Sequence, residues 1–412
     1  MSTALPTSYG LPPLPHELRT EVVERKGVGH PDTLADGIAE LAAIRYSAYC
    51  LAEFGAVLHH NLDKVAVLGG RARFGEKDGT YGRPLRVVFG GRASSSYAGR
   101  QIPVRDILQA AAADYLREAL PGFEQVKWEV HHETTDSSKF RTWFSPRSFN
   151  DLPERPVAYS NDTAYLVATA GRSAAETVAL LTESWMRQYP WVGSDIKALV
   201  VRERSAVTVT TCVPALAGEV SSSEEFGEAL ADAARTLTAH IVERLPEHTV
   251  RVVCNSKDTG RGPVSGQYFT VSGSSVDFGE DGLVGRGNAR SGLITPNQMA
   301  GNEVLFGKNA AYHVGKVGGW LVDEAAAALS RDAGPSRVAV MWRNGARYND
   351  PASIEITTDR PGAMGARQAQ EVVRATLERT DWMADLVERR RYLPQVIPVQ
   401  DLLAELGESG TS

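Results

Sequence analysis

The chain has 412 residues, a formal net charge of -6 at pH 7 and 42% hydrophobic residues. This composition is typical of a globular protein long enough for two or three domains, and the mild acidity argues against a general nucleic-acid binder. No apolar run is long enough to cross a bilayer and no signal peptide is evident, so we expect a cytoplasmic protein without a membrane partner.

Short apolar stretches alternate with longer stretches of helical periodicity after an irregular, proline-rich arm at residues 1–20. We predict helices over 32–54, 103–115, 173–189, 221–245, 309–329 and 367–388, and strands over 64–68, 85–89, 126–130, 164–169, 198–201, 206–213, 250–254, 268–271, 337–342 and 354–357. Strands followed by a long helix recur about three times. This pattern predicts an α+β fold with hairpins and mixed sheets rather than a doubly wound parallel sheet.

One polar loop precedes the first long helix and reads Glu24-Arg25-Lys26-Gly27-Val28-Gly29-His30-Pro31-Asp32. Gly27 and Gly29 are expected to leave room for a ligand to approach the backbone. Asp32 is expected at the N-cap or in the first turn of the helix. An ordinary capped loop is the alternative that composition alone leaves open.

A second polar stretch is rich in glycine and runs from 279 to 288, followed by Arg290, Lys308, His313 and Lys316. Carboxylates that alternate with cations on a glycine scaffold suit a magnesium polyphosphate. A solvated turn with scattered charges is the alternative for any one of these residues.

Several common kinds of site are missing from the sequence. It contains no P-loop motif, no G-x-G-x-x-G that opens a helix and no G-x-S-x-G elbow. Cys50, Cys212 and Cys254 lie far apart in apolar runs, so we expect buried thiols rather than a disulfide framework.

The two polar stretches resemble signatures of the archaeal-type S-adenosylmethionine synthetases, also called methionine adenosyltransferases. The stretches that carry the resemblance are 24–32, 59–61, 161–163, 195–197, 285–288, 292–296, 307–309 and 313–316. They follow in the family's order and spacing and cover the chain from about residue 20 to 400.

The resemblance implies transfer of the adenosyl group of ATP to the sulfur of L-methionine, followed by hydrolysis of the tripolyphosphate. It also implies a homodimer with sites between subunits, Mg²⁺ and K⁺ as cofactors, and three structurally similar units of mixed or antiparallel sheet covered by helices. We place these units at 21–135, with the His30 loop, at 136–250, and at 251–412, with the glycine-rich loop. The boundaries are approximate and the chain can cross between units.

A thioether carries no proton to remove, so the site must align sulfur with C5′ and stabilise a departing triphosphate. By resemblance, His30 would donate to the bridging oxygen or the phosphates, and three cations would grip the triphosphate: Lys197, Arg286 and Lys308. Asp32 and Asp281 would hold metal. The remaining expected contacts to nucleotide or substrate are Glu24, Asp162, Asp195, Glu280 and Lys316.

The sequence departs from the family pattern in several loops. Residues 297–303 replace the usual Phe-Arg-Pro-Met-Ser-Met-Glu, so Gln298 stands where an arginine is expected to bind phosphate. Two alternatives follow: a paralogous ATP-dependent adenosyltransferase that acts on a different nucleophile, or an inactive nucleotide-binding partner subunit. The presence of His30, Asp32 and Lys308 counts against the second.

Overall fold

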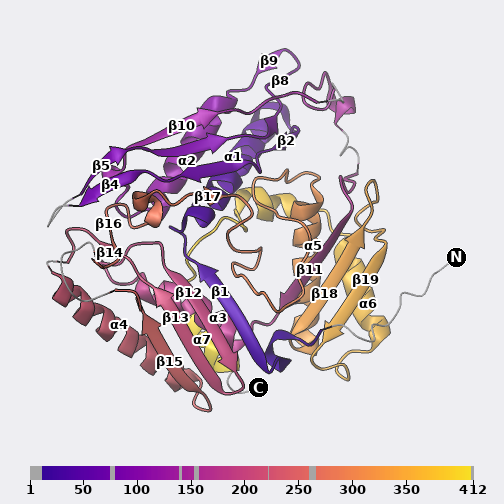
Figure 1. The fold of residues 1–412 in the computed structure, drawn as a ribbon. Coiled ribbons are helices and arrows are strands. Elements are labelled where there is room, and N and C mark those ends of the chain that lie inside the picture. The colour runs from indigo at the N-terminus through magenta and orange to yellow at the C-terminus, as the bar shows by residue number, and fades with distance from the viewer. Residues whose placement is uncertain are drawn as a thin grey trace.

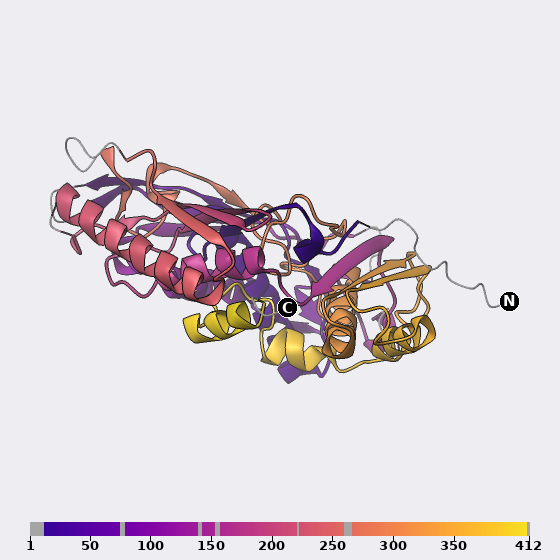
Figure 2. The same ribbon diagram turned by 90° about the horizontal axis from the view of Figure 1, so that it is seen from below.

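The structure is a computed structural model that describes residues 12–74, 79–138, 142–152, 157–220, 222–258 and 266–409. Three sheets surround a central region of loops: those of β1 (Thr20–Lys26), β10 (Trp128–His132) and β11 (Ala164–Ala170) (Figure 1). In the view turned by 90°, most helices gather toward one broad side of the molecule and the strands toward the other (Figure 2).

Each main sheet joins strands from distant parts of the chain. In hydrogen-bonded order, the sheets are β1, β12 (Lys197–Glu203), β13 (Ala206–Cys212) and β15 (Thr249–Cys254); β10, β6 (Leu85–Phe89), β3 (Val65–Leu68) and β17 (Gly282–Leu283); and β11, β18 (Ser336–Trp342) and β19 (Ser353–Thr358). The first two sheets are mixed, because β15 runs parallel to β13 and β10 runs parallel to β6, whereas the third is antiparallel.

The same unit occurs three times: a leading strand, a helix, and an antiparallel strand pair. β1 precedes α1 (Pro31–Phe54) and the pair β3–β6, β11 precedes α3 (Ala174–Met186) and β12–β13, and β17 precedes α5 (Val314–Ala333) and β18–β19. Every leading strand pairs with the strand pair of another unit: β1 with β12, β11 with β18, and β17 with β3. This cyclic exchange interlocks the three units and confirms the predicted α+β fold.

Because of this exchange, the three sheets do not coincide with the contiguous ranges 21–135, 136–250 and 251–412. β1 falls in the first range but pairs with a strand of the second, and β11 falls in the second but pairs with a strand of the third. The chain therefore crosses between units at each leading strand.

The helices lie where their apolar faces require. α1 is buried along most of its length because it packs on β3, β17 and α2 (Val104–Ala119), whereas α4 (Ser223–Arg244) buries a single stripe. That stripe includes the four residues expected from the periodicity, Phe226, Leu230, Leu237 and Ile241. The remaining helices are α6 (Ala366–Leu377) and α7 (Val399–Ser409), with short helical turns at Pro15–Glu17, Phe123–Gln125, Phe149–Asp151, Ser275–Phe278 and Ala384–Glu388.

Three of the predicted helices differ from those observed, and the first of them, α2, continues to Ala119 rather than ending at 115. α5 begins at Val314 rather than at 309, because the side chain of His313 caps its first turn. The predicted helix 367–388 is two pieces, α6 and the turn Ala384–Glu388. The short strands are β2 (His60–Asn61), β4 (Arg71–Phe74), β5 (Gly79–Arg83), β7 (Arg92–Ala93), β8 (Ser96–Tyr97), β9 (Arg100–Gln101), β14 (Ala215–Leu216) and β16 (Phe269–Thr270).

The described part of the N-terminal arm is fastened to the body of the protein. Arg202 donates to the carbonyl oxygens of Pro15 and Leu18 at 3.1 and 3.0 Å, Arg337 donates to that of Pro13 at 3.1 Å, and Leu14 is buried. No helix in the described ranges is long and apolar enough to cross a membrane.

The prediction of buried thiols is wrong for two of the three cysteines, because Cys254 is half-buried and Cys212 is exposed. Cys50 is buried as expected, but Cys212 is exposed because its side chain, at the end of β13, lies on the outward face of the strand.

Candidate active site

The loop between β1 and α1 is pressed against residues 194–196. The amides of Gly27 and Gly29 donate to the carbonyl oxygens of Ile196 and Ser194 at 2.7 and 3.0 Å. A β-carbon at Gly27 would lie 2.7 Å from the oxygen of Ile196, and one at Gly29 would lie 2.1 Å from Oγ of Ser194. Glycine is therefore required at both positions because residues 194–196 pack against them, and these residues fill the space that we expected a ligand to occupy.

A buried ion pair between Arg25 and Glu183 also holds this loop in place. Glu183 of α3, whose side chain is 1% exposed, accepts from Nε of Arg25 at 2.6 Å and from the amide of Val28 at 2.7 Å. Ser274 donates to the carbonyl oxygen of Gly29 at 2.6 Å. These bonds fix the backbone that leads into His30.

His30 is the N-cap of α1, and Asp32 lies in the first turn. Nδ1 of His30 accepts from the amide of Asp32 at 3.2 Å, so a neutral ring carries its proton on Nε2. Burial, the largest cause, lowers the pKa of His30, and nearby Lys26 lowers it further, although Asp195 and Asp32 raise it. At neutral pH the ring is therefore a neutral donor through Nε2.

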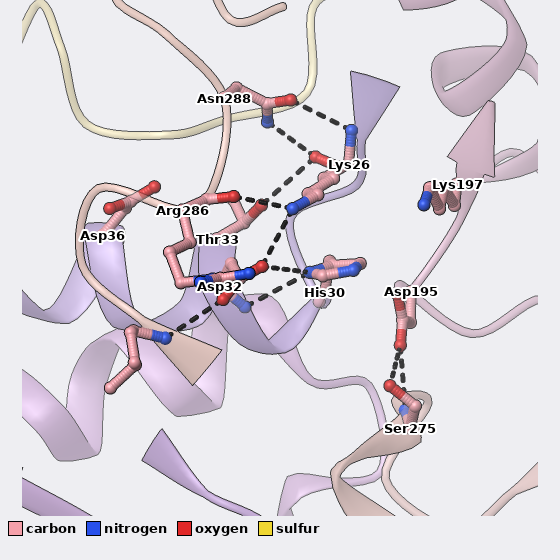
Figure 3. A network of polar contacts seen from close by, with 12 residues as sticks. Lys26, His30, Asp32, Thr33, Asp36, Asp195, Lys197, Ser275, Arg286 and Asn288 are labelled. Atoms are coloured by element: carbon pink, nitrogen blue, oxygen red, sulfur yellow. Dashed lines mark hydrogen bonds and ion pairs between the residues drawn. The ribbon is translucent and has the colours of Figure 1, made fainter. Parts of the chain in front are cut away.

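Asp32 is tied to two other segments through both of its oxygens (Figure 3). Oδ2 accepts from Nζ of Lys26 at 2.9 Å, and Oδ1 accepts from the amide of Leu283 at 3.1 Å. Burial acts to raise the pKa of Asp32, but the bonds from Lys26 and Leu283 outweigh it and hold this pKa below its usual value. Nζ of Lys26 also donates to the carbonyl oxygen of Arg286 at 2.6 Å.

The glycine-rich loop is fastened to β1 and α1 by side chains that the sequence reasoning did not single out. Asn288 makes two bonds with the backbone of Lys26, accepting from its amide at 3.0 Å and donating to its carbonyl oxygen at 2.7 Å. Asp36 accepts from the amide of Gly285 at 2.8 Å, and burial raises the pKa of Asp36 well above its usual value. The sequence feature that could have pointed to Lys26 and Asn288 is their position within the signature stretches 24–32 and 285–288.

Three more predicted residues lie beside His30. Lys197 on β12 is 3.4 Å from Oε1 of Glu24 on the adjacent β1, and 46% of the lysine side chain is exposed. Asp195 is buried, and its Oδ2 accepts from the hydroxyl of Tyr268 at 2.9 Å and from Oγ of Ser275 at 2.6 Å. The structure thus brings His30, Asp32, Asp195, Lys197 and Arg286 into one cluster, to which Lys26 also belongs (Figure 3). Glu24 joins this cluster through its ion pair with Lys197.

Lys308 belongs to a second group of charges. Its Nζ lies 3.1 Å from Oδ2 of Asp63 and 3.4 Å from Oε2 of Glu303. Within the described ranges, no hydrogen bond or ion pair joins Lys308 to the His30 cluster. Glu280 and Asp281 are exposed, and Oδ1 of Asp281 accepts from the amide of Gly69 at 2.9 Å.

Lys316 is not placed to bind a nucleotide. It is fully buried and forms an ion pair with Oε2 of Glu40, which also accepts from the amide of Gly307 at 3.2 Å. Burial, the largest cause, lowers the pKa of Lys316, although Glu40 raises it. Lys316 therefore supports the loop that carries Lys308, which corrects the expectation from the sequence.

A sequence model of the S-adenosylmethionine synthetase (AdoMet synthetase) family matches residues 13–390. The chain belongs to this family. It is 34% identical over 365 residues to a Streptococcus pyogenes protein of uncharacterised function, covering 84% of this chain and 87% of the relative. It is 35% identical over 309 residues to the S-adenosylmethionine synthase of Pyrococcus furiosus, covering 73% of this chain and 75% of the relative.

The fold comparison agrees with this assignment. The structure of an unusual S-adenosylmethionine synthetase from Campylobacter jejuni aligns with a TM-score of 0.54 and 14% identity, covering 95% of this chain and 99% of that one. At this identity the likeness concerns the fold alone.

Two positions of the synthetase signatures have structural partners. Asp162 lies in an exposed turn, where Oδ1 accepts from the amide of Thr163 at 2.7 Å, and the neighbouring Asn161 accepts from the amide of Val314 at the start of α5. The side-chain Nε2 of Gln298 donates to Oε1 of Glu21 and to Oε1 of Glu176, both at 3.3 Å, and Glu21 lies at the opposite end of β1 from Lys26. Within one chain, this position therefore lies away from the His30 cluster.

The carboxylates of this synthetase-family chain do not form a magnesium cage at the predicted position. Magnesium prefers an octahedral set of oxygen ligands, but both oxygens of Asp32 already accept from protein donors. In the part of the chain that the structure describes, the one group of three closely spaced potential ligands is His16, Glu17 and Asp359, which are exposed. The residues at the site therefore do not fit a metal held by the protein alone.

Proposed function

We propose that the chain is a methionine adenosyltransferase, which transfers the adenosyl group of ATP to the sulfur of L-methionine. The observation that carries the proposal is the His30 cluster, where a neutral imidazole donor at the start of α1 lies beside the cations Lys26 and Lys197, and the carbonyl oxygen of Arg286 accepts from Lys26. The N-terminus of a helix favours an anion as well. Family membership supports the same reaction class.

The proposed reaction is a direct displacement at C5′. A lone pair of the methionine sulfur attacks C5′, the bond from C5′ to the bridging oxygen breaks, and its electron pair leaves with the triphosphate. His30 donates from Nε2 to the leaving oxygen, while Lys197 and Arg286 stabilise the charge that develops on the phosphates. Lys197 is half exposed and held by Glu24 at 3.4 Å, so its ammonium can turn toward a bound phosphate.

Magnesium and potassium stay predictions from the resemblance. The donor set around Asp32 does not favour a metal held by protein alone, so no step of the proposed reaction depends on either ion.

We also propose that the chain is a homodimer in which Lys308 of one copy completes the His30 cluster of the other. The separation of Lys308, with Asp63 and Glu303, from the His30 cluster supports this arrangement. The test mixes His30→Asn with Lys308→Ala, each of which is expected to keep only about a hundredth of the parent rate or less on its own. A site shared between copies restores about a quarter of the parent activity, because one heterodimer site is intact. No restoration among exchanged dimers refutes the shared site.

The activity is tested by incubating the protein with ATP, Mg²⁺ and methionine and measuring the products by mass spectrometry. The proposal predicts S-adenosylmethionine in the parent and its loss in His30→Asn. An adduct formed only with another sulfur or nitrogen nucleophile would favour the paralogous adenosyltransferase. Nucleotide binding without turnover would favour the inactive partner subunit.

A further inference from the structure

We propose that Lys26 is a further residue of the leaving-group side of the site, a cation that Asp32 holds in place and that faces the triphosphate. The inference deepens the proposed adenosyl transfer and rests on it. It also gives Asp32 a task that the sequence did not indicate, because the carboxylate serves as the counter-ion of Lys26.

The ammonium of Lys26 has one donor to spare. Lys26 is the last residue of β1, and its Nζ donates to Oδ2 of Asp32 at 2.9 Å and to the carbonyl oxygen of Arg286 at 2.6 Å. An ammonium carries three N–H donors. Within the described ranges the third donor has no hydrogen-bond acceptor, so it is free to take a phosphate oxygen.

Burial explains why the lysine needs Asp32. The side chain of Lys26 is 14% exposed and that of Asp32 is 11% exposed, so an unpaired ammonium at this position would be costly. The ion pair with Asp32 offsets the cost of holding the ammonium at this half-buried position. Because Oδ1 of Asp32 accepts from the amide of Leu283, the carboxylate cannot turn away from Lys26 without losing that bond.

The position of Lys26 relative to His30 fits a role toward the leaving group. Nδ1 of His30 lies 3.9 Å from the same Oδ2 of Asp32 that Lys26 binds, so the imidazole and the ammonium flank one carboxylate oxygen (Figure 3). Lysine binds phosphate as a compact point charge. The bond to the carbonyl oxygen of Arg286 also fixes the residue whose guanidinium is assigned to the phosphates.

A purely structural role for Lys26 is the competing explanation. In that case the lysine only latches the glycine-rich loop to α1, and its charge does not contact the ligand. Lys26→Arg keeps the charge, whereas Lys26→Gln keeps hydrogen-bond donors without it. Lys127, an exposed lysine beside the sheet of β10, is the matched control.

The first experiment is calorimetric titration of tripolyphosphate with EDTA present, so that no divalent metal takes part. We expect Lys26→Gln to bind about tenfold more weakly than the parent, the loss of one charge-assisted bond, and Lys26→Arg to bind within about threefold. Lys127→Gln should bind as the parent does. Parent-like binding by Lys26→Gln, or equal losses in Lys26→Gln and Lys26→Arg, would overturn the inference.

The second experiment needs only the parent fold. With nitrogen-15 lysine, the side-chain signal of Lys26, identified by its loss in Lys26→Arg, should shift when tripolyphosphate is added. An unmoved signal while other site signals shift would refute contact. Failure of the proposed function is distinguishable, because then the parent itself does not bind tripolyphosphate.

Discussion

Replacing Lys316 by methionine should destabilise the protein strongly, because the change leaves Glu40 in the interior without its cation. The side chains of Lys316 and Glu40 are 2% and 1% exposed. Breaking a buried pair by removing one partner costs about 3–5 kcal/mol, mostly from the uncompensated charge. Methionine has similar length and is apolar, so lost packing adds little.

The double variant Lys316→Met/Glu40→Gln separates the stranded charge from other effects. Glutamine removes the charge and keeps an oxygen that can accept from the amide of Gly307, which Glu40 binds at 3.2 Å. We expect the double variant to recover most of the loss and to lie within about 2 kcal/mol of the parent. A leucine at position 40 would instead leave the Gly307 amide without its acceptor.

Urea unfolding followed by tryptophan fluorescence measures these differences, with ATP-analogue binding measured on the folded protein. Stability close to that of the parent, combined with lost nucleotide binding, would refute the reasoning. That result would mean that Lys316 faces the nucleotide, as the sequence led us to expect.

Gly29→Ala should lower the free energy of unfolding by about 2 kcal/mol, because the added β-carbon would lie 2.1 Å from Oγ of Ser194. Gly227→Ala on α4 is the control, because a β-carbon there would meet no neighbouring atom within 4 Å, and it should be neutral or slightly stabilising. Thermal melts check both, and equal melting temperatures would contradict the close approach. Burial lowers the pKa of His313 to about 3. Below about pH 6.5 the unfolded chain therefore binds a proton that the folded chain does not, and the free energy of unfolding decreases as the pH is lowered from about 6.5 to about 3. His313→Asn keeps a capping side chain without the titratable group. When the pH is lowered from 7.5 to 5.5, its free energy of unfolding in urea should decrease by about 1.4 kcal/mol less than that of the parent, and equal decreases would contradict the lowered pKa of His313. Lys308→Ala should raise the barrier by about 3 kcal/mol, roughly a hundredfold in rate, and an unchanged rate in a folded variant would remove Lys308 from the catalytic residues.

Periodicity and loop chemistry predicted most of the elements of the fold but not their pairing. The sequence indicated β1 and α1 around the His30 loop, yet no local pattern says that β1 pairs with β12, about 170 residues further along. Strand exchange depends on which exposed edges meet in space. Local sequence patterns could therefore not predict how the three units exchange their strands.

The site was predictable where its residues lie inside the signatures and less so where distant partners decide their task. His30, Asp32, Lys197 and Arg286 come together as expected. Lys316 looked the same as the other cations, because its partner Glu40 lies 276 residues away and burial is not visible in the sequence. Lys26 was overlooked because Asp32 was assigned to metal, and only the 2.9 Å contact reveals their pairing.

The fate of the bridging oxygen of ATP tests the central claim most directly. ATP that carries oxygen-18 at the oxygen bridging C5′ and the α-phosphorus is incubated with methionine and the protein. The products are separated, and their masses are measured by mass spectrometry. Displacement at C5′ predicts unlabelled S-adenosylmethionine and all of the label in triphosphate or in the phosphate and diphosphate derived from it. Label retained on an adenosine product, or AMP as the labelled product, would contradict the account.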